Sequence, residues 1–333
     1  MLATIQDVAG LTQQGHFRKR IECPACASRE QLAVLVRLPY SSGQIFDWVS
    51  TYYAKKGMFE AGYLEGASYT LLECRKCTLL FQQFVPDKNF LQRLYGVWVN
   101  PEAAIARDRQ GTRANKLIHY LSELWLLQYW GKGRQLKILD YGMGHGRWCE
   151  TAATFGHDVH GYEFEDHRQE DAGRRGVFRT LSYGAIAGGE FDFINTEQVF
   201  EHLADPMPTL QHLLRGLKPG GLIRLSVPHG RNTKANLLRN VKLDFNKRIA
   251  GGLDPVKPLE HLNCFTHAAL RSFGIRAGLQ PFQFSLPQVI ASRQDWRLPR
   301  KFLYNLLQPV YARLRFKDGC SIYFQKPGPA RSI

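Results

Sequence analysis

From residue 134 onward, the pattern of hydrophobic and polar positions switches repeatedly between two periods. Short apolar runs of strand length alternate with stretches in which apolar residues recur at helical spacing. The runs predict strands at 136–142, 158–164, 191–200, 222–228, 280–286 and 320–326. The helical stretches are 146–156, 166–176, 205–221 and 267–278. This alternation predicts an α/β fold in which a parallel sheet is covered by helices on both faces.

The first hundred residues follow a different pattern. β-like runs at 31–38 and 69–84 surround two pairs of cysteines, which predicts a small β-rich module. A helix start with proline at 100–102 and a helical stretch at 115–130 follow. The boundaries predicted from these patterns are 1–98 for the module, 99–133 for a helical linker and 134–333 for the α/β domain.

Composition narrows the class of protein. The chain has 333 residues, of which 44% are hydrophobic and 22% charged, and this excludes disordered and fibrous proteins. No apolar stretch has the roughly 18 to 20 residues of a membrane span, and the start lacks the apolar core of a secretory signal, so we expect a cytoplasmic protein. The net charge is +15, and in residues 231–333 basic residues outnumber acidic ones by 18 to 5. An anionic partner is therefore expected to meet this end.

Four of the seven cysteines form two C-x-x-C pairs, Cys23 with Cys26 and Cys74 with Cys77. In a reducing compartment this spacing favours metal binding over disulfides. Two such pairs supply the four thiolates that structural zinc takes in tetrahedral geometry, so we expect a zinc-ribbon-like module that holds Zn²⁺. The alternative is a set of unrelated buried cysteines. Small apolar core residues are expected at Cys149, Cys264 and Cys320.

The stretch "KILDYGMGHGRW", residues 137–148, is the main candidate for a binding site. An apolar strand ends in Asp140, and Gly142, Gly144 and Gly146 follow before a helix. Glycines at the carboxyl edge of a parallel strand let backbone amides approach a ligand. Glu163 ends the next predicted strand, where a carboxylate can bind ribose hydroxyls. The pattern predicts a nucleoside cofactor, and the short glycine spacing disfavours NAD.

These motifs resemble those of class I S-adenosylmethionine-dependent methyltransferases. "ILDYGMGHG" matches the first motif of that family, "GYEF" its ribose-binding acid, "FDFINTEQVFEHLADP" its fourth strand and loop, and "LLRGLKPGGLIRLSVP" the fifth strand with the helix before it. The resemblance covers about residues 134–290. It implies a Rossmann-like sheet of seven strands and S-adenosylmethionine as cofactor.

The resemblance also implies roles for individual residues. Asp140 would support the glycine loop, and Glu163 would hold the ribose. Backbone contacts to the amino-acid part of the cofactor would come from the first loop, at Tyr141, Gly142, Gly144 and Gly146. Thr196 and Glu197 would lie beside the methionine moiety. The acid that usually binds adenine is not recognisable in "RTLSYGAIAGGE", so that contact is unassigned.

The cysteine pairs ahead of such a domain are similar to those of bacterial methyltransferases of sugar and polysaccharide pathways, including sugar C-methyltransferases. The chain lacks the large additional carboxy-terminal domain of the C-methyltransferases, which favours methylation of oxygen. We therefore expect a sugar-containing, anionic small molecule or lipid-linked acceptor. The alternatives are an RNA methyltransferase and a scaffold that binds the cofactor without catalysis.

Three histidines are candidates for the general base of an O-methylation. "EHLNCFTHAAL", residues 260–270, matches a segment that lies over the cofactor pocket in these families, so His261 is the first candidate. Its alternative role is to fix the loop by hydrogen bonds. His202 follows the fourth strand and His229 the fifth, at the same predicted sheet edge.

A basic amphipathic insertion is predicted at 293–319, between the last two strands. Apolar residues recur there every four positions, with basic residues on either side of the stripe. Such a segment suits either a helix that covers the sheet edge or peripheral contact of 297–316 with an anionic membrane at its inner face. The same charge suits RNA, although few aromatic residues are interleaved with it. The sequence leaves the oligomeric state open.

Overall fold

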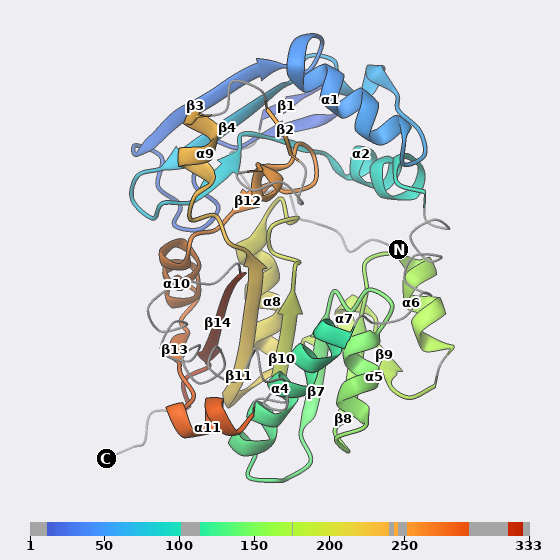
Figure 1. The fold of residues 1–333 in the computed structure, drawn as a ribbon, viewed down its shortest axis with the longest axis vertical. Coiled ribbons are helices and arrows are strands. Elements are labelled where there is room, and N and C mark those ends of the chain that lie inside the picture. The colour runs from blue at the N-terminus through green and yellow to red at the C-terminus, as the bar shows by residue number, and fades with distance from the viewer. Residues whose placement is uncertain are drawn as a thin grey trace.

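The computed structural model describes residues 12–100, 114–174, 176–239, 243–245, 252–292 and 319–328. The predicted helix start at 100–102 and the basic insertion at 293–319 fall almost entirely outside these ranges, so both stay predictions. Figure 1 shows an N-terminal part, in blue, above a larger sheet with its helices. No helix in the described ranges is long and apolar enough to cross a membrane.

The larger part is built on one sheet of seven strands, in the order β13-β14-β11-β10-β7-β8-β9. Its strands are β7 Lys137–Tyr141, β8 Asp158–Tyr162, β9 Arg179–Thr180, β10 Phe191–Glu197, β11 Leu217–Pro228, β13 Gln280–Phe282 and β14 Gly319–Gln325. The strands from β11 to β9 are parallel, whereas β14 runs antiparallel to β11 and β13 antiparallel to β14. The predicted fold class, an α/β sheet of seven strands, is confirmed.

Helices cover both faces of this sheet. One face packs against α4 Ala114–Trp130, α5 Arg147–Ala153 and α11 Leu286–Ala291. The other packs against α7 Tyr183–Ile186, α8 Pro206–Gly216 and α10 His267–Arg276. Because the central strands are covered on both faces, β10 is buried along almost its whole length, although four of the seven residues in "FDFINTE" are polar. The helix α6 Asp166–Gly173 follows β8.

The N-terminal part contains two small sheets. The first has the order β12-β5-β4-β3 and the second β1-β2-β6. Their strands are β1 Thr12–Gln14, β2 Phe17–Lys19, β3 Leu32–Pro39, β4 Ser68–Cys74, β5 Leu80–Gln82, β6 Phe84–Pro86 and β12 Asn263–Cys264. The strand β12 comes from the segment predicted to belong to the α/β domain, and it pairs antiparallel with β5. The two parts of the chain therefore share a sheet.

The β-rich module also contains a helix that the sequence pattern did not predict. The helix α1 Gly43–Ala54 lies between β3 and β4, and it buries Ile45, Val49 and Tyr53 at successive spacings of four. This insertion accounts for the long separation of the two cysteine pairs. The shorter helices are η1 Ala61–Leu64, α2 Lys88–Arg93, the π-helix η2 Leu94–Trp98, α9 Thr233–Arg239 and η3 Asp254–Val256.

Candidate functional site

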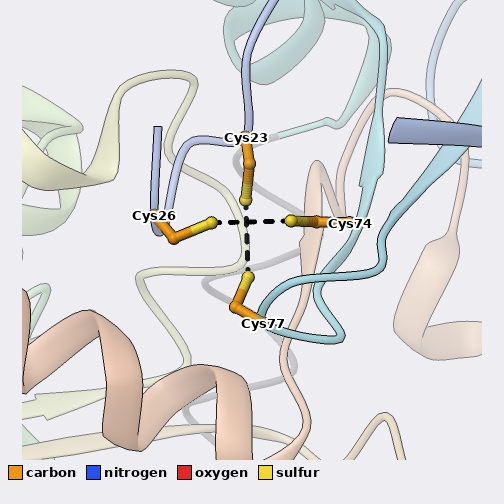
Figure 2. A group of neighbouring side chains, drawn as sticks. All are labelled: Cys23, Cys26, Cys74 and Cys77. Atoms are coloured by element: carbon orange, nitrogen blue, oxygen red, sulfur yellow. Dashed lines mark hydrogen bonds between the residues drawn. The ribbon is translucent and has the colours of Figure 1, made fainter. Parts of the chain in front are cut away.

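The four cysteines of the two C-x-x-C pairs lie together, and we call Cys23, Cys26, Cys74 and Cys77 the cysteine cluster. Figure 2 shows their side chains pointing to one centre. The Sγ atoms of Cys23 and Cys77 are 3.5 Å apart, as are those of Cys26 and Cys74. All four lie within 4.8 Å of one another. These distances exclude disulfides, and they are close to the edge of about 3.8 Å of a tetrahedron with zinc–sulfur bonds of about 2.3 Å.

Both halves of the cysteine cluster are tight turns of the same design. The amide of Ala27 donates to the carbonyl of Cys23 at 2.8 Å, and the amide of Thr78 donates to that of Cys74 at 2.7 Å. Ala27 and Thr78 both have positive φ, 54° and 65°. The backbone conformation of each turn therefore directs both of its thiols to the same side of the turn.

The chemistry of this donor set fits zinc. The adjacent thiol of Cys77 and burial raise the pKa of Cys23, and burial raises the pKa of Cys26 to about 11. A divalent cation at the centre would stabilise the thiolates and so offset the free-energy cost of ionising these buried thiols. Four protein ligands fill a tetrahedral shell, so such a metal would be structural.

The glycine loop connects β7 to α5 at the carboxyl edge of the large sheet. Gly142, Gly144 and Gly146 all have positive φ, 79°, 56° and 75°. A β-carbon on Gly142 would lie 2.4 Å from Val199 Cγ2, and one on Gly146 would lie 2.4 Å from Phe178 Cζ. These two glycines are required by packing as well as by backbone conformation.

Gly144 differs from its two neighbours in the loop. No atom lies within 4 Å of the position that its β-carbon would take, so the loop opens to free space there. Its amide donates to Glu163 Oε2 at 2.7 Å. The Glu163 carboxylate also accepts from the amide of Phe164 at 2.9 Å. Glu163, the predicted ribose-binding acid, is thus hydrogen-bonded directly to Gly144, where the loop is open. This arrangement fits a nucleoside cofactor.

Asp140, the second-to-last residue of β7, belongs to a buried polar network next to the glycine loop. Its Oδ1 accepts from Asn195 Nδ2 at 2.8 Å, and Asn195 Oδ1 accepts from Arg224 at 2.9 Å. Arg224 is 2% exposed and pairs with Glu123 of α4 at 2.5 Å. Burial raises the pKa of Asp140 to about 7, and the Asn195 hydrogen bond opposes that shift. The network ties the loop to three strands and a helix.

Thr196 and Glu197 end β10 on opposite sides of the strand. The Thr196 hydroxyl is fully buried and donates to the carbonyl of Arg224 at 2.9 Å. The Glu197 side chain is 25% exposed and lies 3.9 Å from the Arg224 guanidinium. Of the two, Glu197 reaches out of the sheet edge, whereas the Thr196 side chain is used within the sheet.

Two of the candidate histidines lie side by side with a carboxylate, and we call Glu201, His202 and His261 the histidine–glutamate cluster. One donor atom from each residue lies within 4.8 Å of the other two. The rings of His202 and His261 are 4.9 Å apart, and Glu201 Oε1 is 3.8 Å from His202 Nε2. Glu201 is 1% exposed and His261 7%, while the His202 side chain is 31% exposed.

Backbone carbonyls select the tautomer of both histidines. His202 Nδ1 lies 2.9 Å from the carbonyl of Glu260, and His261 Nδ1 lies 2.5 Å from that of Asp254. Because a carbonyl only accepts, Nδ1 carries the proton in each ring and the lone pair is on Nε2. Burial lowers the pKa of His202, which favours this neutral form. The Tyr95 hydroxyl, from the π-helix η2, lies 3.4 Å from His202 Nδ1.

The N-terminal sheet positions the segment that carries His261. Gln82 Nε2 donates to the carbonyls of Lys257 and His261 at 2.8 and 2.9 Å, and the Gln82 amide donates to the carbonyl of Leu262 at 3.0 Å. Gln82 follows the second cysteine turn by five residues along the chain. The cysteine cluster and the histidine–glutamate cluster are therefore linked through one strand.

His229 is placed differently from the other two histidines. Its Nδ1 accepts from the amide of Arg231 at 2.9 Å, so the neutral ring carries its proton on Nε2. A ring in this state does not offer a lone pair to an acceptor hydroxyl. The geometry is that of a histidine which stabilises the turn after β11.

Several residues of this region were not predicted from the sequence. They are Tyr95, Gln82, Glu123, Asn195, Glu201 and Arg224. Arg224 carried a recognisable signal, because it is a charge in the middle of the apolar run "LIRLSVP". Glu201 lies directly before His202 in the sequence. The others are brought to the site by contacts between distant segments.

Comparison with known families identifies the α/β part. The profile of a family described as a methyltransferase domain matches residues 106–283. A ubiquinone biosynthesis O-methyltransferase of Leptothrix cholodnii is 30% identical over an alignment of 142 residues, and the match covers 38% of this chain and 60% of that protein. The corresponding enzyme of Methylococcus capsulatus is 32% identical over an alignment of 124 residues, and the match covers 34% of this chain and 52% of that protein. The chain thus spans between half and three fifths of the length of these relatives.

Solved structures give a more distant likeness. The plantazolicin methyltransferase BamL is 14% identical, with a TM-score of 0.48, and the match covers 71% of this chain and 93% of that one. A protein of Galdieria sulphuraria described as a putative sarcosine dimethylglycine methyltransferase is 19% identical, with a TM-score of 0.39, and the match covers 62% of this chain and 85% of that one.

Proposed function

Because this chain belongs to the methyltransferase-domain family, we propose that it transfers a methyl group from S-adenosylmethionine to an oxygen atom of its acceptor. One observation carries this proposal. The open glycine of the loop and the histidine–glutamate cluster lie at the same edge of the sheet, where Val199 of the segment after β10 packs on Gly142 and Glu201 follows two residues later. Cofactor and acceptor would meet there.

The cofactor would be held by the glycine loop and the two adjacent strand ends. Glu163 would exchange its hydrogen bond to Gly144 for bonds to the ribose hydroxyls, and backbone groups from Tyr141 to Gly146 would contact the amino-acid part. Glu197 would face the methionine moiety from β10. The bound cofactor supplies an activated methyl group on a sulfonium, so the protein mainly has to align it with the acceptor.

The acceptor hydroxyl would face the histidine–glutamate cluster. In both rings of the cluster the lone pair is on Nε2, as a group that takes a proton from a hydroxyl requires. We propose His261 as the base and His202 as its neighbour in the same cluster. Tyr95 lies against His202 and would contact the acceptor from the N-terminal part.

We propose a sugar-containing, anionic acceptor, either small or lipid-linked. The cysteine pairs that resemble those of sugar-pathway methyltransferases support the sugar, and the basic last third of the chain supports the negative charge. The relatives named as O-methyltransferases support transfer to oxygen. Zinc in the cysteine cluster would stabilise the strand that positions His261 and would take no part in the transfer.

The test is transfer of label from methyl-labelled S-adenosylmethionine to an extract of the source cell, separated into nucleotide-sugar, lipid and RNA fractions. Label in the sugar or lipid fraction supports the proposal. Mild acid hydrolysis of the lipid fraction then distinguishes lipid-linked sugars from lipids without sugar. Label in RNA alone overturns the proposal of a sugar-containing acceptor, and the absence of label in every fraction overturns the assignment as an enzyme. Gly144→Ala is expected to lose the label, while Gly156→Ala, a control with similar backbone geometry at the opposite sheet edge, keeps it.

A further inference from the structure

The histidine–glutamate cluster has the donor set of a metal site. Two imidazole nitrogens and one carboxylate oxygen from separate side chains lie within 4.8 Å of one another. Glu201 Oε1 lies 3.8 Å from His202 Nε2. That is too long for a hydrogen bond, but two ligands each about 2.1 Å from a shared metal can lie up to about 4.2 Å apart.

The surroundings of both rings match those of metal-binding histidines. Such a histidine usually donates its other ring N–H to a carbonyl or carboxylate, which fixes the ring and its tautomer. His202 and His261 both do so, through the carbonyls of Glu260 and Asp254. The segment from Asp254 to His261 is itself fixed by the side chain of Gln82. The lone pairs on Nε2 are therefore preorganised without a metal.

We propose that Glu201, His202 and His261 bind a divalent transition metal, zinc or iron(II), at the acceptor end of the site. Two nitrogens and one oxygen favour these ions over magnesium, which prefers oxygen ligands. Three protein ligands leave at least one coordination position open, unlike the closed cysteine cluster. The partial exposure of His202 gives solvent and ligands access to that position.

The second part of this inference rests on the proposed function. An acceptor oxygen in the open position would be favoured in its deprotonated form by the cation. The metal would then take over the task that the His261 lone pair has in the metal-free protein, since one nitrogen cannot bind a metal and a proton at the same time. Metal binding itself is independent of methyl transfer and is tested separately.

The experiment is a titration of the metal-stripped full chain with Co²⁺, followed by optical absorption and metal analysis. Wild type is expected to bind two equivalents. One gives the strong near-ultraviolet sulfur-to-cobalt bands of the cysteine cluster, and the second gives only weak visible bands. Glu201→Gln and His202→Asn are expected to bind one equivalent and to keep the sulfur bands, which report that the N-terminal part is folded. Cys77→Ser is expected to lose the sulfur-to-cobalt bands of the cysteine cluster.

His229→Ala is the matched control, because it removes a histidine from the same sheet edge and should keep both equivalents. Zn²⁺ is expected to displace the second cobalt, while millimolar Mg²⁺ is not. A wild type that binds one equivalent, at the cysteines alone, overturns the proposal, as does a second equivalent that survives in both Glu201→Gln and His202→Asn. Methyl transfer by the stripped protein would leave the proposed function standing and remove only the role of the metal in it.

Discussion

The cysteine cluster and the histidine–glutamate cluster are both groups of metal-binding side chains, but they are assembled in opposite ways. The cysteine cluster is made by two short turns, each closed by its own hydrogen bond between residues four apart. The histidine–glutamate cluster combines the segment after β10 with a segment about sixty residues later, and a strand of the N-terminal part holds it in place. The first is closed around its centre, and the second is partly exposed through the His202 side chain.

The difference teaches how the two regions depend on the rest of the molecule. A cluster built from local turns keeps its geometry as long as a metal joins the two halves. A cluster built from distant segments depends on every contact that holds those segments. We therefore expect damage to the cysteine cluster to reach the histidine–glutamate cluster through Gln82, whereas damage to the histidine–glutamate cluster should leave the cysteines unchanged.

Cys77→Ser should have the largest effect, because it opens the shell on which the N-terminal sheet depends. We expect loss of bound zinc and a decrease in the free energy of unfolding of roughly 5 kcal/mol or more. Metal analysis and thermal unfolding measure this. Cys320→Ala, which removes a buried thiol in β14, should keep the metal. A Cys77→Ser protein with full zinc content and unchanged melting temperature would contradict the assignment.

The second effect concerns the buried polar network below the glycine loop. The pKa of Asp140 is about 7 in the folded protein, above its unfolded value, so its contribution to stability is present below about pH 4 and is lost as the pH rises to about 7. A difference of about three units corresponds to at most about 4 kcal/mol. Denaturant unfolding between pH 4 and pH 8 measures the slope.

Asp140→Asn should flatten this slope, since an amide keeps an oxygen for Asn195 and does not ionise. Asp47→Asn, on the exposed part of α1, is the control and should leave the slope unchanged. If Asp140→Asn and wild type have the same pH dependence, burial does not control the ionisation of this carboxylate.

Gln82→Ala tests the link between the two clusters. It removes the two hydrogen bonds to the carbonyls of Lys257 and His261 and the one that the Gln82 side-chain oxygen accepts from the amide of Leu259. We expect a loss of about 2 kcal/mol of stability together with a decrease in turnover of at least tenfold. Zinc in the cysteine cluster should be retained. Gln83→Ala, at the next position along the chain, is the matched control. Unchanged turnover in Gln82→Ala would show that the two clusters are independent.

Gly144→Ala is expected to have the smallest effect on stability, and it is the most direct test of cofactor binding. An alanine with positive φ costs about 1 to 2 kcal/mol, and its methyl group would enter the free space above the loop. We expect a decrease in S-adenosylmethionine affinity of at least tenfold by calorimetry. Gly156→Ala has a φ of 76° and equally free surroundings, so it should cost the same stability and leave cofactor affinity intact.

The distinction between local and distant contacts also explains which parts of the structure can be predicted from the sequence. The cysteine pairs, the glycine loop and the strand before it are set by neighbouring residues, and the pattern predicted them as they are observed. The helix α1 was missed because the prediction followed the strands on either side of it. The contact of Gln82 with His261 joins residues 179 positions apart, and no local pattern encodes it.

Buried charges were the other limit of prediction. Arg224 is surrounded by apolar residues in sequence. Only the fold shows that Glu123 forms an ion pair with its guanidinium and that Asn195 accepts a hydrogen bond from it. The roles of Glu163, Glu197 and the histidines stay predictions that the experiments above address. Their positions at one sheet edge follow from the order of the strands, which the alternating pattern alone does not determine.

The pairing of β12 with β5 has a consequence for the order in which the protein acquires its structure during synthesis. The edge of β5 leaves the ribosome long before residues 263–264, which complete its sheet. At about 5 to 20 residues per second, this edge would wait roughly ten to forty seconds for its partner. During that interval the nascent chain carries an unpaired strand beside four reduced thiols, and such an edge is a template for pairing with other chains. Early capture of zinc would hold the thiols in place during this interval, so zinc supply during translation is expected to govern the yield of soluble protein.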